Sequence, residues 1–264
     1  MSHSEPEAIQ LTREGGVATI TLNRPKVKNA LTPAQFGELG SAFDEVAAGD
    51  ARALIITGAG PKAFCAGADI AELSGRSLME QKRGAEVGQA TFAMLDRLPI
   101  PSLAIINGYA FGGGLELALA CTFRLVTPNA KLGTPEIKLG LLPGYGGTQR
   151  LPRIVGEARA LEMVLTGKSI DAQLAVAWGL ASGIVEGDEK AVLDQGMAFA
   201  REFSNYSLPA LSLAREAVRR ALDTPLHEGL KIEADLSTLA FNTGDAAEGT
   251  AAFLEKRKPK FKDR

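Results

Sequence analysis

Residues 107–121 read NGYAFGGGLELALAC, where three consecutive glycines precede an apolar run that contains one carboxylate, Glu116. The apolar neighbours of this carboxylate cover every direction around a helix, so the pattern predicts a helix over 113–121 that is buried on all sides. Burial raises the pKa of a carboxyl group, whereas the start of a helix lowers it. The segment therefore predicts a buried helix whose glutamate can exchange a proton near neutral pH.

The glycines at 112–114 allow the backbone to approach a ligand closely. The N–H groups at the start of a helix carry partial positive charge, which suits an oxyanion formed from a carbonyl. Close helix–strand packing is the alternative explanation for these glycines. For Glu116 the alternative is a capping role, although a capping box would require Ser or Thr at the position of Gly113.

The segments around this helix predict an α/β fold. Strand-like apolar patterns occupy 15–25, 52–60, 101–108 and 122–127, and helical spacing occupies 32–48 and 78–98. This alternation predicts a mainly parallel sheet with crossover helices. Helical periodicity dominates later, so we divide the chain into a core over 1–195 and a helical region with a basic tail over 196–264. We expect the helical region to pack against another subunit, and the alternative is that it folds back on its own core.

The composition excludes several classes of partner. The chain has 264 residues, 45% of them apolar, and a formal net charge of −2, so no overall field favours nucleic acid or an anionic membrane. No run approaches the length of a membrane span, and the amino terminus lacks a secretory pattern. Two cysteines, Cys65 and Cys121, fit a reducing compartment, so we expect a cytoplasmic protein. The basic tail is either solvated or an anion-binding arm.

The sequence gives little support to a function that depends on histidine, on a metal ion or on a bound nucleotide. The histidines are His3 and His227, and no G-x-S-x-G elbow accompanies them. No metal-ligand spacing is present, so we expect no metal. The sequence TGKS at 166–169 resembles the end of a P-loop, but Glu162 stands where the first glycine is required. The sequence GAGPKA at 58–63 matches a dinucleotide pattern and leaves a dehydrogenase as a weak alternative.

A second carboxylate, Glu136, follows Pro135 and precedes a glycine-rich turn and a helix. Taken alone, Glu136 is better explained as an exposed surface residue. A functional role for Glu136 is favoured only by three longer sequence segments that resemble a known family. The chain resembles the enoyl-CoA hydratase/isomerase (crotonase) family in FCAGADI at 64–70, in residues 107–121 and in GTPEIKLGLLPGYGGTQRLPRIVG at 133–156. Weaker matches extend the resemblance over nearly the whole chain.

The resemblance implies a fold of stacked ββα turns with a carboxy-terminal helical region that forms trimers, usually paired as hexamers. It implies a site for acyl-CoA thioesters, with the thioester oxygen between the N–H groups of Ala66 and Gly113. Coenzyme A is part of such a substrate, so no separate cofactor is expected. The implied coenzyme A contacts are Arg24, Lys26, Ala66, Gly67, Ala68, Asp69, Ile70, Gly112, Gly113, Lys256 and Lys260, with the tail lysines acting across a subunit boundary.

For a hydratase, the resemblance implies that Glu116 activates water for attack on the β-carbon of a trans-2-enoyl thioester. Glu136, protonated, would then deliver a proton to the α-carbon. Two positions depart from the family pattern. Thr122 replaces a frequent aspartate, and Tyr145 stands where small residues are frequent and would narrow the pocket near Glu136.

Enoyl-CoA hydratase is therefore the leading hypothesis. The enzymatic alternatives are a Δ3-Δ2 enoyl-CoA isomerase and a hydratase of branched or aromatic acyl-CoA. A non-catalytic CoA-binding or RNA-associated scaffold belongs to a different class, and the presence of both glutamates argues against it.

Overall fold

The computed structural model describes residues 7–264, and its core is built on two sheets. The larger sheet has the order β1 (Ile9–Glu14), β2 (Val17–Leu22), β3 (Ala53–Gly58), β5 (Ser102–Ile106), β7 (Phe123–Val126) and β10 (Gly183–Ile184). The smaller sheet has the order β4 (Ala63–Cys65), β6 (Tyr109–Phe111), β8 (Lys131–Gly133) and β9 (Ser169–Asp171). All neighbours pair in parallel except β1 with β2 and β8 with β9, which confirms a mainly parallel α/β core.

The helices follow the strands in a repeating order. Those of the core are α1 (Pro33–Ala48), α2 (Ile70–Leu73), α3 (Leu78–Arg97), α4 (Gly113–Ala120), α5 (Gly147–Val155), α6 (Glu157–Thr166), α7 (Ala172–Ala177) and α8 (Glu189–Ser204). Two short 3-10 helices, η1 (Pro25–Val27) and η2 (Pro135–Leu139), precede α1 and α5. Strands β3, β5 and β7 enter the larger sheet and their successors β4, β6 and β8 the smaller one. Each pair leads into a helix, which is the expected stack of ββα turns.

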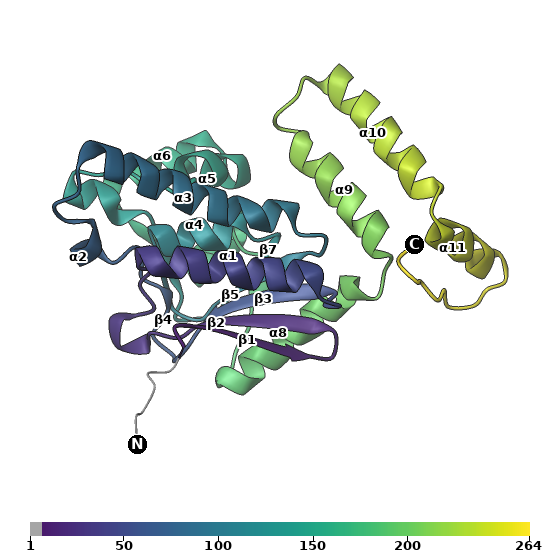
Figure 1. Ribbon diagram of the computed structural model, residues 1–264, viewed down its shortest axis with the longest axis horizontal. Coiled ribbons are helices and arrows are strands. Elements are labelled where there is room, and N and C mark those ends of the chain that lie inside the picture. The colour runs from purple at the N-terminus through teal and green to yellow at the C-terminus, as the bar shows by residue number, and fades with distance from the viewer. Residues whose placement is uncertain (1–6) are drawn as a thin grey trace.

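Both faces of the larger sheet are covered, which explains its nearly continuous apolar strands. Leu54 and Ile56 of β3 join one hydrophobic cluster with α1, α3 and α4, whereas Ile55 joins a second cluster with α8. All eight residues of α4 are buried, so the sequence prediction for this helix is confirmed. Figure 1 shows α1 and α3 on one side of the sheet and α8 on the other.

The carboxy-terminal helices are α9 (Leu208–Arg220), α10 (Leu226–Phe241) and α11 (Gly244–Leu254). They extend away from the core (Figure 1), and neither α9 nor α10 contains a buried residue. The division expected between residues 195 and 196 falls within α8, which itself packs on the sheet.

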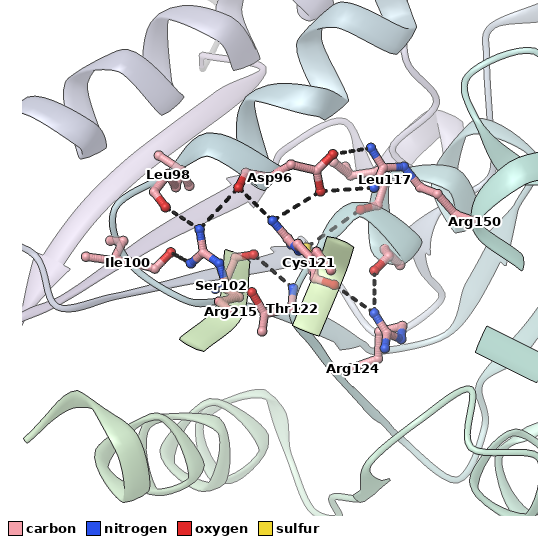
Figure 2. Close-up of polar contacts among 12 residues, drawn as sticks. Asp96, Leu98, Ile100, Ser102, Leu117, Cys121, Thr122, Arg124, Arg150 and Arg215 are labelled. Atoms are coloured by element: carbon pink, nitrogen blue, oxygen red, sulfur yellow. Dashed lines mark hydrogen bonds and ion pairs between the residues drawn. The ribbon is translucent and has the colours of Figure 1, made fainter. Parts of the chain in front are cut away.

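Arginine side chains join α9 to the core (Figure 2). Arg215 donates to the carbonyls of Asp96, Leu98 and Ile100 at the end of α3. Arg219 donates to the Asp96 carbonyl at 2.7 Å and pairs with its carboxylate at 3.3 Å. Arg150 of α5 binds the same carboxylate through both terminal nitrogens, at 3.0 and 2.5 Å. Asp96 therefore links α3, α5 and α9.

Candidate active site

Glu116 lies in the first turn of α4 and is 1% exposed. Its Oε1 accepts hydrogen bonds from the N–H groups of Tyr145 at 2.8 Å and Gly147 at 2.7 Å, where α5 begins. Burial raises the pKa of this carboxyl to about 7, partly opposed by the two N–H donors, and the charge of Glu136 raises it further. The predicted proton exchange near neutrality therefore has a structural basis, although the donors come from the turn before α5 and from its first residue rather than from the start of α4.

Glu136 lies in η2 and points toward the same place. A Cβ at Gly112 would lie 2.8 Å from Oε1 of Glu136, so the carboxylate rests against the glycine that precedes α4. Its Oε2 is buried and has no hydrogen-bond partner among residues 7–264. Burial raises the pKa of Glu136 as well. An unpartnered carboxyl oxygen favours the protonated form, which suits a proton donor.

The proposed pair of N–H donors requires one correction. The N–H of Ala66 already donates to the carbonyl of Lys28 at 3.0 Å, so it is not available for a ligand. Ala68 fits the role instead, because a Cβ at Gly113 would lie 3.5 Å from its amide nitrogen. Within the described chain, the N–H groups of Ala68 and Gly113 have no hydrogen-bond acceptor.

The glycines next to Ala68 and Gly113 are required because other backbone atoms approach them closely. Gly67 has φ +105°, and a Cβ there would lie 2.9 Å from the carbonyl oxygen of Phe111. Gly114 packs against β4, because its Cβ would lie 2.1 Å from the carbonyl oxygen of Cys65. Packing therefore explains Gly114, whereas Gly112 and Gly113 border the site itself.

The segment 66–70 lies beside the loop that carries Arg24. Arg24 approaches the Asp69 carboxylate at 3.7 Å and donates to the carbonyl of Ala30 at 2.8 Å, so its charge is already balanced within the chain. Lys26 is exposed. Ile70, which begins α2, is 52% exposed. This surface is open to a ligand, and its contacts with coenzyme A stay a prediction.

The tail lysines lie elsewhere. Lys256 and Lys260 follow α11, at the opposite end of the molecule from α2 (Figure 1). The backbone N–H of Lys260 donates to Glu248 of α11, so the tail returns along its own helix. Within one chain these lysines do not join the segment 66–70, and their predicted role requires a second copy.

A cavity of about 390 Å³ opens beside Ala68. Its lining comprises Leu31, Pro33, Phe36, Ala68, Asp69, Leu73, Arg76, Glu80, Arg83, Gly84, Val87 and Tyr145. The Tyr145 ring borders the cavity, as the sequence prediction of a narrowed pocket requires. Thr122, the other departure, exchanges hydrogen bonds with Ser102 at the start of β5.

Residues 7–264 form no evident site for histidine, metal or dinucleotide chemistry. His227 has a 74% exposed side chain beside Glu228, and His3 lies outside the described residues, as does part of the amino terminus in which no targeting pattern was found. Across residues 7–264, no three His, Cys, Asp or Glu side chains are grouped to hold a metal ion, and no helix is long and apolar enough to cross a membrane. The dinucleotide pattern leads into β4 rather than a helix, which removes the dehydrogenase alternative.

Sequence reasoning missed the turn that holds Glu116. A Cβ at Gly147 would lie 3.0 Å from both Cγ and Oε1 of Glu116, so a side chain there would force the Glu116 carboxylate to shift. The glycines of PGYGG before α5 were the available signal, since a glycine-rich turn into a helix is typical of an anion site.

Together, these features define a class of protein whose site combines two backbone N–H donors with one buried and one half-buried carboxyl group, an arrangement that can polarise a carbonyl and move protons. A family model described as enoyl-CoA hydratase/isomerase matches residues 12–264. The chain belongs to this family.

Similar proteins cover almost the whole chain. A probable enoyl-CoA hydratase of Rhizobium meliloti (strain 1021) is 41% identical over 98% of this chain and 99% of its own. A crotonyl-CoA hydratase of Syntrophomonas wolfei subsp. wolfei is 40% identical over 97% of this chain and 98% of its own. The crystal structure of an enoyl-CoA hydratase from Bacillus anthracis superposes with a TM-score of 0.92 at 37% identity, over 98% of this chain and 100% of that one.

Proposed function

We propose that the protein is an enoyl-CoA hydratase, which adds water reversibly and syn across the 2,3 double bond of a trans-2-enoyl-CoA to give a 3-hydroxyacyl-CoA. The observation that carries the proposal is the meeting of a buried carboxyl group, Glu116, and a half-buried one, Glu136, both with raised pKa, beside two backbone N–H groups that have no acceptor among residues 7–264. The names of the relatives agree with it.

In the proposed reaction, the thioester oxygen accepts hydrogen bonds from Ala68 and Gly113. Glu116, ionised, takes a proton from water as the water oxygen bonds to the β-carbon. The double-bond electrons move toward the thioester, whose oxygen gains charge that the N–H groups stabilise. Glu136, protonated, gives its proton to the α-carbon. Water is thereby added across the double bond, and the two carboxyl groups end with their protonation states exchanged.

Two carboxyl groups in one site favour hydration over Δ3-Δ2 isomerisation, which requires a proton to move between two carbons and no water. The proposed reaction uses no cofactor, because coenzyme A arrives with the substrate. We also propose a homotrimer, or a homohexamer formed by two trimers, supported by exposed apolar side chains on α9 and α10. The mass in solution, measured by light scattering, tests the assembly.

The test of the reaction follows the loss of enoyl thioester absorbance with crotonyl-CoA. Glu116→Gln and Glu136→Gln should each reduce kcat by roughly 100- to 10,000-fold, the usual contribution of a positioned acid or base. Glu38→Gln, at an exposed position of α1, is the matched control and should keep the full rate.

The outcomes separate the hypotheses. A wild-type protein that does not hydrate crotonyl-CoA would exclude the simple hydratase. Conversion of a 3-enoyl-CoA without hydration of crotonyl-CoA would identify an isomerase instead. If either glutamine variant keeps nearly the full rate, the two-carboxylate mechanism is wrong even though the enzyme is a hydratase.

A further inference from the structure

The Tyr145 ring is wedged between α3 and α4 at the edge of the site. A Cβ at Gly88 of α3 would lie 2.3 Å from Cδ1 of Tyr145, and a Cβ at Gly113 of α4 would lie 3.1 Å from Cδ2. Opposite edges of one ring therefore contact glycines on two helices. Gly88 could not carry a side chain with the ring in this position, and a side chain at Gly113 would require the ring to shift.

Two further aromatic rings support Tyr145. The ring centroids of Phe36 and Phe92 lie 5.0 and 6.0 Å from that of Tyr145. Both phenylalanines are buried, at 4% and 0% exposure. A ring held by glycine on two sides and by fixed aromatic neighbours cannot move without displacing packed side chains.

The position of this ring relative to the reacting atoms is set by its own backbone. The N–H of Tyr145 binds Oε1 of Glu116, which acts at the β-carbon in the proposed reaction. The ring also contacts Gly113, whose N–H binds the thioester oxygen in that reaction. An acyl chain that continues beyond the β-carbon therefore meets the ring within a few bonds.

We propose that Tyr145 determines the acyl-chain length accepted by this site: its ring forms the wall of the acyl pocket and favours short 2-enoyl chains. This inference rests on the proposed function for the position of the thioester. The cavity lining mixes the apolar side chains of Leu31, Leu73 and Val87 with the charged side chains of Arg76 and Arg83, and these guanidinium groups do not favour a longer alkyl chain beside them.

The test compares hydration of trans-2-enoyl-CoA substrates of four and ten carbons. In the wild type, kcat/KM for the ten-carbon substrate should be at least about 10-fold below that for crotonyl-CoA, since methylenes that a pocket cannot accommodate cost roughly this much or more. Tyr145→Ala should raise the ratio of ten- to four-carbon kcat/KM by about 10-fold or more, whereas Tyr145→Phe keeps the ring and should keep the ratio. Tyr206→Ala, at a 57% exposed tyrosine of the α8–α9 connection, is the matched control and should also keep it.

Binding separates a failure of this inference from a failure of the proposed function. Dissociation constants for butyryl-CoA and decanoyl-CoA, measured by calorimetry, need no turnover. In an open apolar pocket each added methylene that becomes buried tightens binding by about fourfold. If the Tyr145 ring closes the acyl pocket, the wild type should bind decanoyl-CoA no more tightly than butyryl-CoA. This expectation holds even if the protein does not hydrate crotonyl-CoA.

A wild-type protein that hydrates the ten-carbon substrate as well as crotonyl-CoA, or binds decanoyl-CoA at least 10-fold more tightly than butyryl-CoA, would overturn the inference. An unchanged ratio in a folded Tyr145→Ala variant would also overturn it. If that variant does not fold, the two wild-type measurements decide.

Discussion

Replacement of Glu116 by glutamine is expected to stabilise the folded chain at alkaline pH while it removes activity. The carboxyl group is 1% exposed, and burial raises its pKa from an ordinary 4.5 to about 7. In the unfolded chain the same group ionises near its ordinary pKa. Between these two pH values the folded state therefore holds a proton that the unfolded state has released.

This difference in bound protons determines whether the folded state gains or loses stability as the pH rises. Stability from the raised pKa of Glu116 is fully present below pH 4.5 and is lost as the pH rises to about 7. At about 1.4 kcal/mol per pH unit, the loss amounts to about 3 kcal/mol. Glutamine has no charge to bury, and its amide oxygen can still accept from the N–H groups of Tyr145 and Gly147.

The assay is urea unfolding of the wild type and Glu116→Gln at pH 5 and pH 8, at one protein concentration so that any self-association contributes equally to both proteins. The variant should be more stable by about 3 kcal/mol at pH 8 and by less than about 1 kcal/mol at pH 5. Glu38→Gln, exposed on α1, should show no such pH dependence. An equal effect of Glu116→Gln at both pH values, or a loss of stability at pH 8, would refute the argument that burial sets the pKa of Glu116.

Three other predictions concern the same region. Gly147→Ala should reduce kcat by roughly 10- to 100-fold, because the new Cβ displaces the Glu116 carboxylate; Gly37→Ala, which meets no atom within 4 Å, is its control. The ascending limb of kcat/KM against pH should have its midpoint near pH 7, since the pKa of Glu116 is about 7, and a midpoint between pH 4 and 5 would contradict this. Burial raises the pKa of Cys65 and Cys121 to about 12, so a disulfide reagent at pH 8 should label neither thiol of the native protein within the time that it labels both in urea; rapid native labelling would argue against their burial.

Local patterns were sufficient to predict the main helices and the strands β2, β3, β5 and β7 of the larger sheet, but not its strands β1 and β10. Thr32 and Pro33 marked the start of α1, and there the Thr32 N–H donates to the side chain of Gln35 at 2.8 Å. The apolar run around Glu116 predicted that α4 is buried on all sides. Each strand of the smaller sheet has three residues, which are too few to show a period, so these strands were implied only by the family resemblance.

The site was less predictable, because its geometry depends on backbone directions and distant contacts. Ala66 and Ala68 are the same residue type two positions apart, and the sequence does not show that the N–H of Ala66 is bound to Lys28. The donors to Glu116 lie 29 and 31 residues along the chain. No local spacing connects them, so the position of Glu116 could be predicted but not the groups that set its pKa.

The attachment of α9 has a consequence for how this part of the molecule can change over time. Arg215 reaches the main-chain carbonyls of Leu98 and Ile100, so the acceptors are present whichever amino acids occupy these positions. Amino-acid substitutions at positions 98 and 100 can alter the apolar packing there without removing the hydrogen bonds from Arg215. The contact between α9 and the end of α3 would therefore leave no correlated substitutions at these positions. Substitution of Arg215 alone would remove these hydrogen bonds and loosen this side of the contact.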